Sequence, residues 1–254
     1  MISGMNSGCS KFAILAAPRT GSNMLCTMLN SHPRILCHHE IFNPDGIFYA
    51  LELRDGVFNL GSRSERDRDP LGFLQRVWDR DLGHSRVGFK MTLRQNEAVF
   101  DAVLHDPGVR KIILHRRNRV KTYVSWLIAQ QTGQWEVYRK ADVVSDRPKV
   151  RVEAAAFYDH LARNDEYYAQ IERTLDETGQ QALNTDYERL FGDDELRRIL
   201  SFLEVGLDTA DWRSAATSVR QNPIDLRQLI CNFEDLESAW GESPLGRELH
   251  SLEY

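Results

Sequence analysis

Short apolar runs alternate with longer helical patterns along most of the chain, and this alternation predicts its fold. The apolar runs are bounded by turn residues, as buried strands are, and they cover 11–17, 34–39, 86–91, 109–115 and 181–187. The helical patterns cover 21–31, roughly 70–82, 95–105, 118–131, 152–178 and 193–204. Strands that alternate with helices form a parallel sheet covered on both faces. We therefore predict an α/β protein with a three-layer α/β/α, P-loop-type fold and a central parallel sheet.

Two segments fit this alternation poorly. Residues 55–69 and 133–149 are polar stretches that contain glycine, and both are expected to be loops or insertions. A chain of 254 residues suits one large α/β domain. We expect a single domain over 1–254, in which residues 1–10 form a flexible N-terminal tail.

Composition and charge narrow the class of protein. Charged residues make up 27% of the chain and the net charge is -5, which argues against a general nucleic-acid binder. The four cysteines form no CxxC pair, a pattern more typical of reduced core thiols than of disulfides. No apolar run approaches the length of a membrane span, and the first residues lack the apolar core of a signal peptide. We expect a cytoplasmic protein with no stable membrane insertion.

The turn after the first strand, "PRTGSNML", has the outline of a phosphate-binding loop. Gly21 permits a tight turn and a close approach of phosphate to the backbone, and Thr20 to Asn23 begin the following helix. The free N–H groups and the positive end of the helix dipole therefore face the loop. Ser22 and Asn23 add side-chain donors, and Arg19 adds a fork that suits phosphate or sulfate oxygens. The alternative is an ordinary strand–turn–helix in which Thr20 or Ser22 is a cap.

This loop lacks two features of enzymes that hydrolyse or transfer nucleoside triphosphates. The lysine of the G-x-x-x-x-G-K-[ST] motif is absent, and no apolar strand ends in an obvious magnesium-binding Asp. The sequence therefore predicts a phosphate-containing ligand that binds without a metal.

A second basic site follows the strand 109–115. Arg117, Lys121 and Ser125 recur every four residues, so a helix over 118–131 is expected to place them on roughly one face. Arg117 and Ser125 are candidates to hold one phosphate at the start of that helix. A solvated basic helix face is the alternative.

Two phosphate sites, one in the first loop and one at a later strand–helix junction, resemble the sulfotransferases that use 3′-phosphoadenosine 5′-phosphosulfate (PAPS). The resemblance is closest to the bacterial carbohydrate sulfotransferases, mainly the nodulation-factor group and more distantly the trehalose group. Its pieces run from the first strand almost to the C-terminus and occur in order: "FAILAAPRTGSNML", "NSHPRILCHHEIFN", "VGFKMT", "VRKIILHRRNRVKTYVSWLIAQQTGQW", "DYERLFGD" and "SVRQNPIDLRQLICNFEDL".

The resemblance implies a role for each basic site. It implies that the first loop, with Arg19, Thr20, Gly21, Ser22 and Asn23, holds the 5′-phosphosulfate. It also implies that an arginine and a serine eight residues later hold the 3′-phosphate, a spacing that Arg117 and Ser125 match. Many members carry Lys where this chain has Arg19. Arginine keeps the positive charge of that lysine, but it does not readily give up a proton.

The catalytic base follows from the same resemblance. Some members place a histidine two residues after a lysine on a central strand, but this chain has Thr92 after Lys90 there. Glycan-modifying members resemble "HHEIFNP" instead, so we assign the base to Glu40, whose pKa is expected to rise through burial in the closed complex. A helix cap or a structural ion pair is the alternative for Glu40, and His38 or His39 is the alternative base.

The remaining candidates are also implied by likeness. Lys90 is expected to contact the substrate or the transferring group, with a surface lysine as the alternative. Arg220 and Gln221 lie in a segment that resembles the nucleotide cover of the family and are candidates for the 3′-phosphate or the adenine. Tyr187 and Glu188 are read as structural.

The predicted function is transfer of a sulfuryl group from PAPS to a hydroxyl of a small-molecule or glycan acceptor, with PAP as product and no metal. A carbohydrate or glycolipid is the expected acceptor, and residues 41–80 and 133–150 are the expected acceptor-site insertions. A P-loop kinase for a small alcohol or nucleoside is one alternative, and a non-catalytic nucleotide-binding protein is the other.

Overall fold

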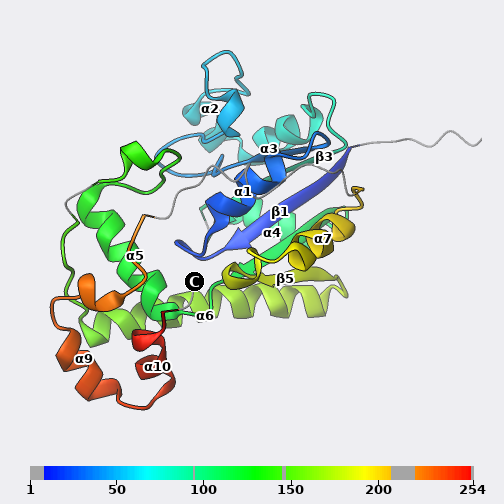
Figure 1. The fold of residues 1–254 in the computed structure, drawn as a ribbon. Helices are drawn as coiled ribbons and strands as arrows, with labels where there is room; N and C mark the ends of the chain where they lie inside the picture. The colour runs from blue at the N-terminus through cyan, green and yellow to red at the C-terminus, as the bar shows by residue number, and fades with distance from the viewer. Residues whose placement is uncertain (1–8, 94, 145–146, 207–220, 253–254) are drawn as a thin grey trace, which may run out of the picture.

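The structure is a computed structural model that describes residues 9–93, 95–144, 147–206 and 221–252. Its centre is a five-stranded parallel sheet in the order β2-β3-β1-β4-β5, drawn in Figure 1. The strands are β1 (Ser10–Ala16), β2 (Ile35–His38), β3 (Arg86–Thr92), β4 (Val109–His115) and β5 (Ala182–Asp186). Each overlaps one of the five predicted apolar runs to within one or two residues at either end, so the predicted parallel sheet is confirmed.

Both faces of this sheet are covered by helices, because successive side chains of each strand point to opposite faces. On β1, Phe12 and Ile14 pack on one face with residues of α1 (Ser22–Asn30) and α7 (Asp193–Phe202). Ala13 and Leu15 pack on the other face with residues of α3 (Pro70–Asp79), α4 (Glu97–His105) and α6 (Ala154–Glu177). The predicted three layers are therefore confirmed.

A third apolar cluster lies beside the sheet and carries two helices that the sequence patterns did not predict. It joins α5 (Arg119–Thr132) and the first turns of α6 to α9 (Phe233–Trp240) and α10 (Pro244–His250). Figure 1 shows α9 and α10, in orange and red, beside one end of α6. A short turn, η4 (Leu226–Gln228), precedes α9.

The prediction of a loop over 55–69 is wrong for six of its residues. They form α2 (Arg63–Arg68), which begins at a capping box in which Ser62 and Glu65 satisfy each other's backbone N–H groups. The helix has no apolar stripe, and its Arg66 is 1% exposed and donates to the carbonyls of residues 41, 43 and 46. A buried arginine thus fastens the segment that follows β2. The described part of 133–149 contains one short turn, η2 (Lys140–Asp142).

The topology places a ligand site at the carboxyl end of β1. From β1 the chain crosses to β2 and β3 on one side of the sheet, and β4 and β5 lie on the other side. In such sheets ligands bind in the crevice where the strand order reverses. The loop 17–21 leaves β1 at this point, and η1 (Leu51–Leu53) and η3 (Tyr187–Arg189) lie in the segments that follow β2 and β5.

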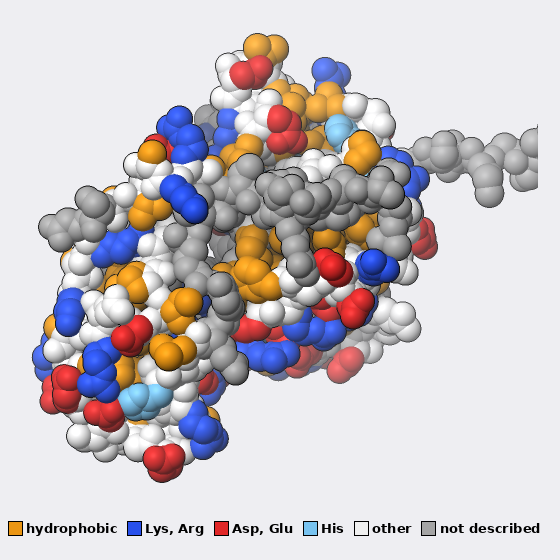
Figure 2. All heavy atoms as spheres, in the orientation of Figure 1, with side chains coloured by type: hydrophobic (Ala, Val, Ile, Leu, Met, Phe, Trp, Pro, Cys, Tyr) orange, Lys and Arg blue, Asp and Glu red, His pale blue; other side chains and the backbone are white. Residues whose placement is uncertain are grey.

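The described part of the chain has no helix suited to span a membrane, and the face drawn in Figure 2 carries mixed charges. None of the helices in the described part of the chain is both long and apolar enough to cross a bilayer. Figure 2 shows Lys and Arg side chains interspersed with Asp and Glu on the face that it draws.

Candidate functional site: a pocket at the carboxyl end of the sheet

The first loop turns sharply and needs glycine at one position. Arg19 and Gly21 have φ angles of 66° and 90°, and α1 begins at Ser22 immediately after the turn. A Cβ atom on Gly21 would lie 2.2 Å from Cδ2 of Tyr187. Both the positive φ and the close ring therefore favour glycine here.

The predicted loop residues divide into those that line the pocket and one that supports the turn. Arg19, Gly21, Ser22 and Asn23 line a pocket of about 1360 Å³. The hydroxyl of Thr20 points inward instead and donates to the carbonyl of Ala17 at 2.8 Å. Ligand pockets span roughly 300–1,000 Å³, so this one has room for a nucleotide and a second substrate together.

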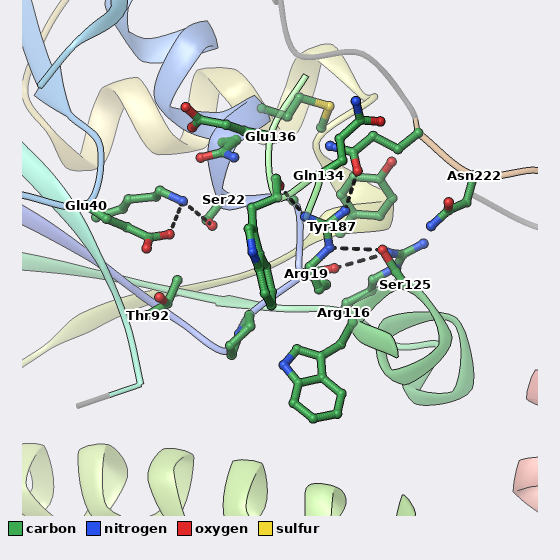
Figure 3. Close-up of a pocket in the computed structure, with 18 of the residues that line it drawn as sticks. Arg19, Ser22, Glu40, Thr92, Arg116, Ser125, Gln134, Glu136, Tyr187 and Asn222 are labelled. Carbon is green, nitrogen blue, oxygen red and sulfur yellow. Dashed lines mark hydrogen bonds and ion pairs between the residues drawn. The ribbon is translucent and has the colours of Figure 1, made fainter. Parts of the chain in front are cut away.

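Arg19 is the residue that joins the pocket's separate segments (Figure 3). Its Nε donates to Oγ of Ser125 on α5 at 3.0 Å, and its Nη2 donates to Oε1 of Gln221 at 2.9 Å. Its Nη1 donates to the carbonyl of Trp135. One side chain thus links the first loop to α5, to the segment after that helix and to the C-terminal part of the chain.

Arg116 is a pocket residue that the sequence reasoning missed. Its Nη1 donates to the carbonyl of Arg19 at 3.1 Å, and its guanidinium lies 4.7 Å from the ring centre of Tyr187. Tyr187, read from the sequence as structural, also lines the pocket. The alternation of side chains along β4 and its continuation was the available signal, since it sends Arg116 and Arg117 to opposite sides.

Several cations converge at this end of the pocket. Burial, together with the charges of Arg116 and Arg147, lowers the pKa of Arg19 to about 10, so Arg19 stays cationic at neutral pH. Lys121 is 7% exposed and also lines the pocket. Buried like charges raise each other's free energy, and an anion bound among them relieves this cost. The arrangement is that of an anion site at a helix N-terminus.

The structure brings Ser125 into this site but places Arg117 elsewhere. Asn118 is the N-cap of α5 and the helix begins at Arg119, so Arg117 precedes the helical face that Lys121 and Ser125 share. The Arg117 side chain donates to Oδ2 of Asp186 at 2.8 and 3.1 Å and lines a separate pocket of about 440 Å³. A role for Arg117 at the 3′-phosphate stays a prediction from spacing. Of the C-terminal pair, Gln221 lines the large pocket and Arg220 lies outside the described residues.

Glu40 and Lys90 form a buried ion pair at the other end of the pocket. Lys90 Nζ lies 2.6 Å from Oε1 of Glu40 and 3.4 Å from Oγ of Ser22, and the Lys90 side chain is 4% exposed. Amide groups of Asn43 and Gln95 each donate to Oε2 of Glu40 at 2.6 Å. Burial raises the pKa of Glu40, but the Lys90 charge and these hydrogen bonds together lower it to about 2. The pKa of Glu40 is therefore not raised in this structure, because the Lys90 ammonium is already paired with the carboxylate.

The two alternative bases occupy different environments. His39 lines the pocket, and burial and neighbouring cations hold its pKa well below the usual range. Its Nδ1 lies 3.1 Å from Oδ1 of Asn23 and 3.3 Å from the hydroxyl of Tyr138. His38 lies behind the pocket, where its ring packs against Tyr49 and Phe58.

The pocket wall contains aromatic and polar side chains from both segments predicted to shape an acceptor site. Asn43, Asp45 and Phe48 come from the first, and Gln134 and Trp135 come from the second. Trp135 is 47% exposed, so its ring is open to a ligand. Among the described residues, no three His, Cys, Asp or Glu side chains are grouped as metal ligands would be.

Known proteins similar in sequence to this chain match it over most of their length. No family model matches the sequence. Nodulation protein H of Rhizobium meliloti is 28% identical over 241 residues, and the match covers 93% of each chain. Nodulation protein H of Rhizobium tropici is 26% identical over 247 residues, and the match covers 93% of this chain and 91% of the relative. A sulfotransferase structure from Alicyclobacillus acidocaldarius matches at 19% identity and a TM-score of 0.47 over 94% of each chain. A mouse sulfotransferase in complex with PAP matches at 15% identity and a TM-score of 0.42, over 90% of this chain and 67% of that one.

The likeness to nodulation protein H therefore spans nearly the whole chain and confirms the resemblance to the PAPS-dependent sulfotransferases that the sequence motifs predicted.

Proposed function

We propose that this protein transfers the sulfuryl group of PAPS to a hydroxyl of a carbohydrate acceptor and releases PAP. The observation that carries the proposal is one pocket with a cationic end and a carboxylate end. Arg19, Arg116 and Lys121 line it with the first turn of α1, and Glu40 lines it together with Lys90. A doubly phosphorylated donor and a neutral hydroxyl are the two partners that such a pocket suits.

The cationic end has the donor groups that this co-substrate requires. Ser22, Asn23 and the N-terminus of α1 are assigned to the 5′-phosphosulfate, with Gly21 as the close approach and Thr20 as the brace of the turn. Ser125 is assigned to the 3′-phosphate. Arg117 remains the partner predicted by spacing, and Arg116 is the partner favoured by position. Gln221 is assigned to the segment that covers the nucleotide, and so is Arg220, which precedes it in the sequence.

The carboxylate end is assigned to the acceptor. PAPS supplies an activated sulfuryl group, whose sulfur is attacked by the acceptor oxygen while the bond to the bridging 5′-phosphate oxygen breaks. Glu40 takes the proton of the attacking hydroxyl. Lys90 and Arg19 stabilise the charge that develops on the bridging oxygen and on the sulfuryl oxygens, where fixed cations have their largest effect. None of these roles needs a metal ion.

A carbohydrate acceptor is supported by the group to which the relatives belong and by the pocket wall. Trp135 and Phe48 offer faces for a sugar ring, and Gln134 adds an amide group to the wall. We propose that the parts of 41–80 and 133–150 around these residues are acceptor-site insertions in a single domain of residues 1–254. The cysteines that the structure describes are unpaired, which supports a cytoplasmic location.

PAP is expected to stabilise the folded protein without magnesium. Two phosphate sites tied to one nucleotide favour PAP over AMP, and PAP at about a hundred times its dissociation constant adds roughly 2.7 kcal/mol to the free energy of unfolding. The measurement is the melting temperature with PAP, AMP or ATP-Mg. A shift with ATP-Mg and none with PAP would favour the kinase alternative.

Arg116→Ala is expected to weaken PAP binding more than Arg117→Ala. Arg116 lines the large pocket, whereas Arg117 is paired with Asp186 outside it. Removing a charge-assisted contact costs on the order of 1.5–3 kcal/mol, or roughly 10- to 150-fold in affinity. Calorimetric titration of each variant with PAP and with AMP checks this. If Arg117→Ala loses more affinity than Arg116→Ala, and for PAP but not for AMP, then Arg117 binds the 3′-phosphate and its ion pair with Asp186 opens when PAP binds.

A further inference from the structure

The Glu40 carboxylate has a different kind of partner on each oxygen. Oε2 accepts from two neutral amides, Asn43 Nδ2 and Gln95 Nε2, each at 2.6 Å. Oε1 accepts from the ammonium of Lys90, also at 2.6 Å. A side-chain amide does not titrate near neutral pH, so it remains a neutral donor. The amides therefore fix the carboxylate in place, and the ammonium covers the oxygen that they leave.

In this arrangement Glu40 is a poor acceptor of a further proton. Its pKa is lowered to about 2, although burial alone raises it, because the positive charge of Lys90 is so close. The proton affinity of a general base rises with its pKa, so a carboxylate in this state contributes little to catalysis near neutral pH. A base at this position has to lose the ammonium from Oε1 before the acceptor hydroxyl can approach.

Lys90 has a second destination within reach. Its Nζ already lies 3.4 Å from Oγ of Ser22, the first residue of α1. The N-terminus of that helix is where an anionic 5′ group is attracted by free N–H groups. The ammonium therefore lies between one resident anion, Glu40, and the place of an incoming one. A lysine side chain has several rotatable bonds, so the transfer needs no movement of the strand β3.

We propose that Lys90 covers the basic oxygen Oε1 of Glu40 until the sulfuryl donor binds, and that Asn43 and Gln95 hold Oε2 while the ammonium moves to the donor. This inference rests on the proposed function and adds an order to it. The base is released only in the donor-bound enzyme, and Oε1 is the atom that takes the acceptor's proton. Asn43 and Gln95 are positioning residues, since they act on the acceptor through Glu40.

The consequence that can be measured is a proton taken up when the donor site is filled. Once the ammonium leaves, burial and two neutral hydrogen bonds remain around Glu40, so its pKa rises. Arg19 also interacts with Glu40, and it is present in both proteins. Glu40→Gln leaves the other titratable residues of the pocket unchanged, namely His39, Asp45, Arg116, Lys121, Glu136 and Tyr187. Comparison with a variant that lacks only the carboxylate therefore isolates the proton of Glu40.

The test is calorimetry of PAP binding in buffers of different ionisation enthalpy, between about pH 4 and 6, where carboxyl groups titrate. We expect wild type to take up more protons than Glu40→Gln, with the difference approaching one. Any proton released by the phosphates of PAP is common to both. An equal proton number in the two proteins overturns the proposal. If PAP does not bind to wild type at all, the proposed function fails as well, which is a different result from binding without proton uptake.

Two further variants separate the moving charge from a merely structural contact. Gln95→Met removes one hydrogen bond to Glu40 and leaves the ammonium, so the proton uptake should remain. Lys90→Met removes the ammonium, so Glu40 already has its raised pKa and the uptake should disappear. Loss of the proton uptake in Gln95→Met, with the uptake retained in Lys90→Met, overturns the proposal. Infrared difference spectra of wild type need no variant: PAP should produce the band of a protonated carboxyl group, and the absence of this band also overturns the proposal.

Discussion

Glu40→Gln is expected to lower turnover by about 10²–10⁴-fold, the usual contribution of a general base, while PAP affinity does not fall. Glutamine keeps the shape of the side chain and its contacts with Asn43 and Gln95, but it cannot take a proton. Glu40 lies at the end of the pocket away from Arg116, so the cationic end remains intact. The measurement is transfer of labelled sulfuryl from PAPS to an acceptor found by screening glycans, lipids and phenols, beside a PAP titration.

Glu136→Gln is the matched comparison, since Glu136 is a second carboxylate in the same pocket. It accepts from Arg54 at 2.6 Å and from the hydroxyl of Tyr138 at 2.7 Å. A larger loss of turnover for Glu136→Gln than for Glu40→Gln would move the base to Glu136. Near-normal turnover of Glu40→Gln, with Glu136 also excluded, would make His39 the next candidate. A collapse of PAP affinity in Glu40→Gln would mark Glu40 as a structural residue.

Local patterns predicted the sheet and its main helices because each of these elements buries a recognisable apolar stripe. The strand 11–17 and the helix 193–204, for example, contribute Ile14 and Ile199 to the same core cluster. Helix α2 carries no such stripe. It is held by a capping box and by the buried guanidinium of Arg66, and the three carbonyls that Arg66 binds are known only once the chain has folded. The capping-box pattern at Ser62 and Glu65 was its one local signal.

The candidate site also contains residues that local sequence predicts and residues that only the fold brings together. The first loop and Ser125 were predictable because a turn and a helix face are set by residues close in sequence. The choice between Arg116 and Arg117 depends on where α5 begins, and element boundaries are what sequence patterns define least well. Gln95 and Tyr187 enter the pocket from segments whose positions depend on packing against β3 and β5. Nothing in their local sequence distinguishes them from surface residues.

Gly21 lies directly against the ring of Tyr187 in the pocket. An added Cβ on Gly21 would lie 2.2 Å from Cδ2 and 2.7 Å from Cε2 of the Tyr187 ring, far inside van der Waals contact. The same ring lies 4.7 Å from the guanidinium of Arg116. Displacement of the ring would therefore also displace a cation of the phosphate end. Gly179 provides a control, since its φ is 62° and an added Cβ there would meet nothing within 4 Å.

Gly21→Ala is therefore expected to cost more stability than Gly179→Ala and to lose PAP binding as well. A non-glycine residue at positive φ costs about 1–2 kcal/mol, which both variants bear, and displacing a packed ring adds about 1–3 kcal/mol at Gly21 alone. For a chain of this size, each kcal/mol lowers the melting temperature by roughly 2–4 °C. PAP affinity should fall on the order of a hundredfold in Gly21→Ala, because both the turn and Arg116 shift, and should not change in Gly179→Ala.

The double variant Gly21→Ala/Tyr187→Ala should be more stable than the two single losses combined predict, since the clash is gone. Strict additivity, together with full PAP affinity in Gly21→Ala, would show that the ring moves freely and that the first loop does not depend on it.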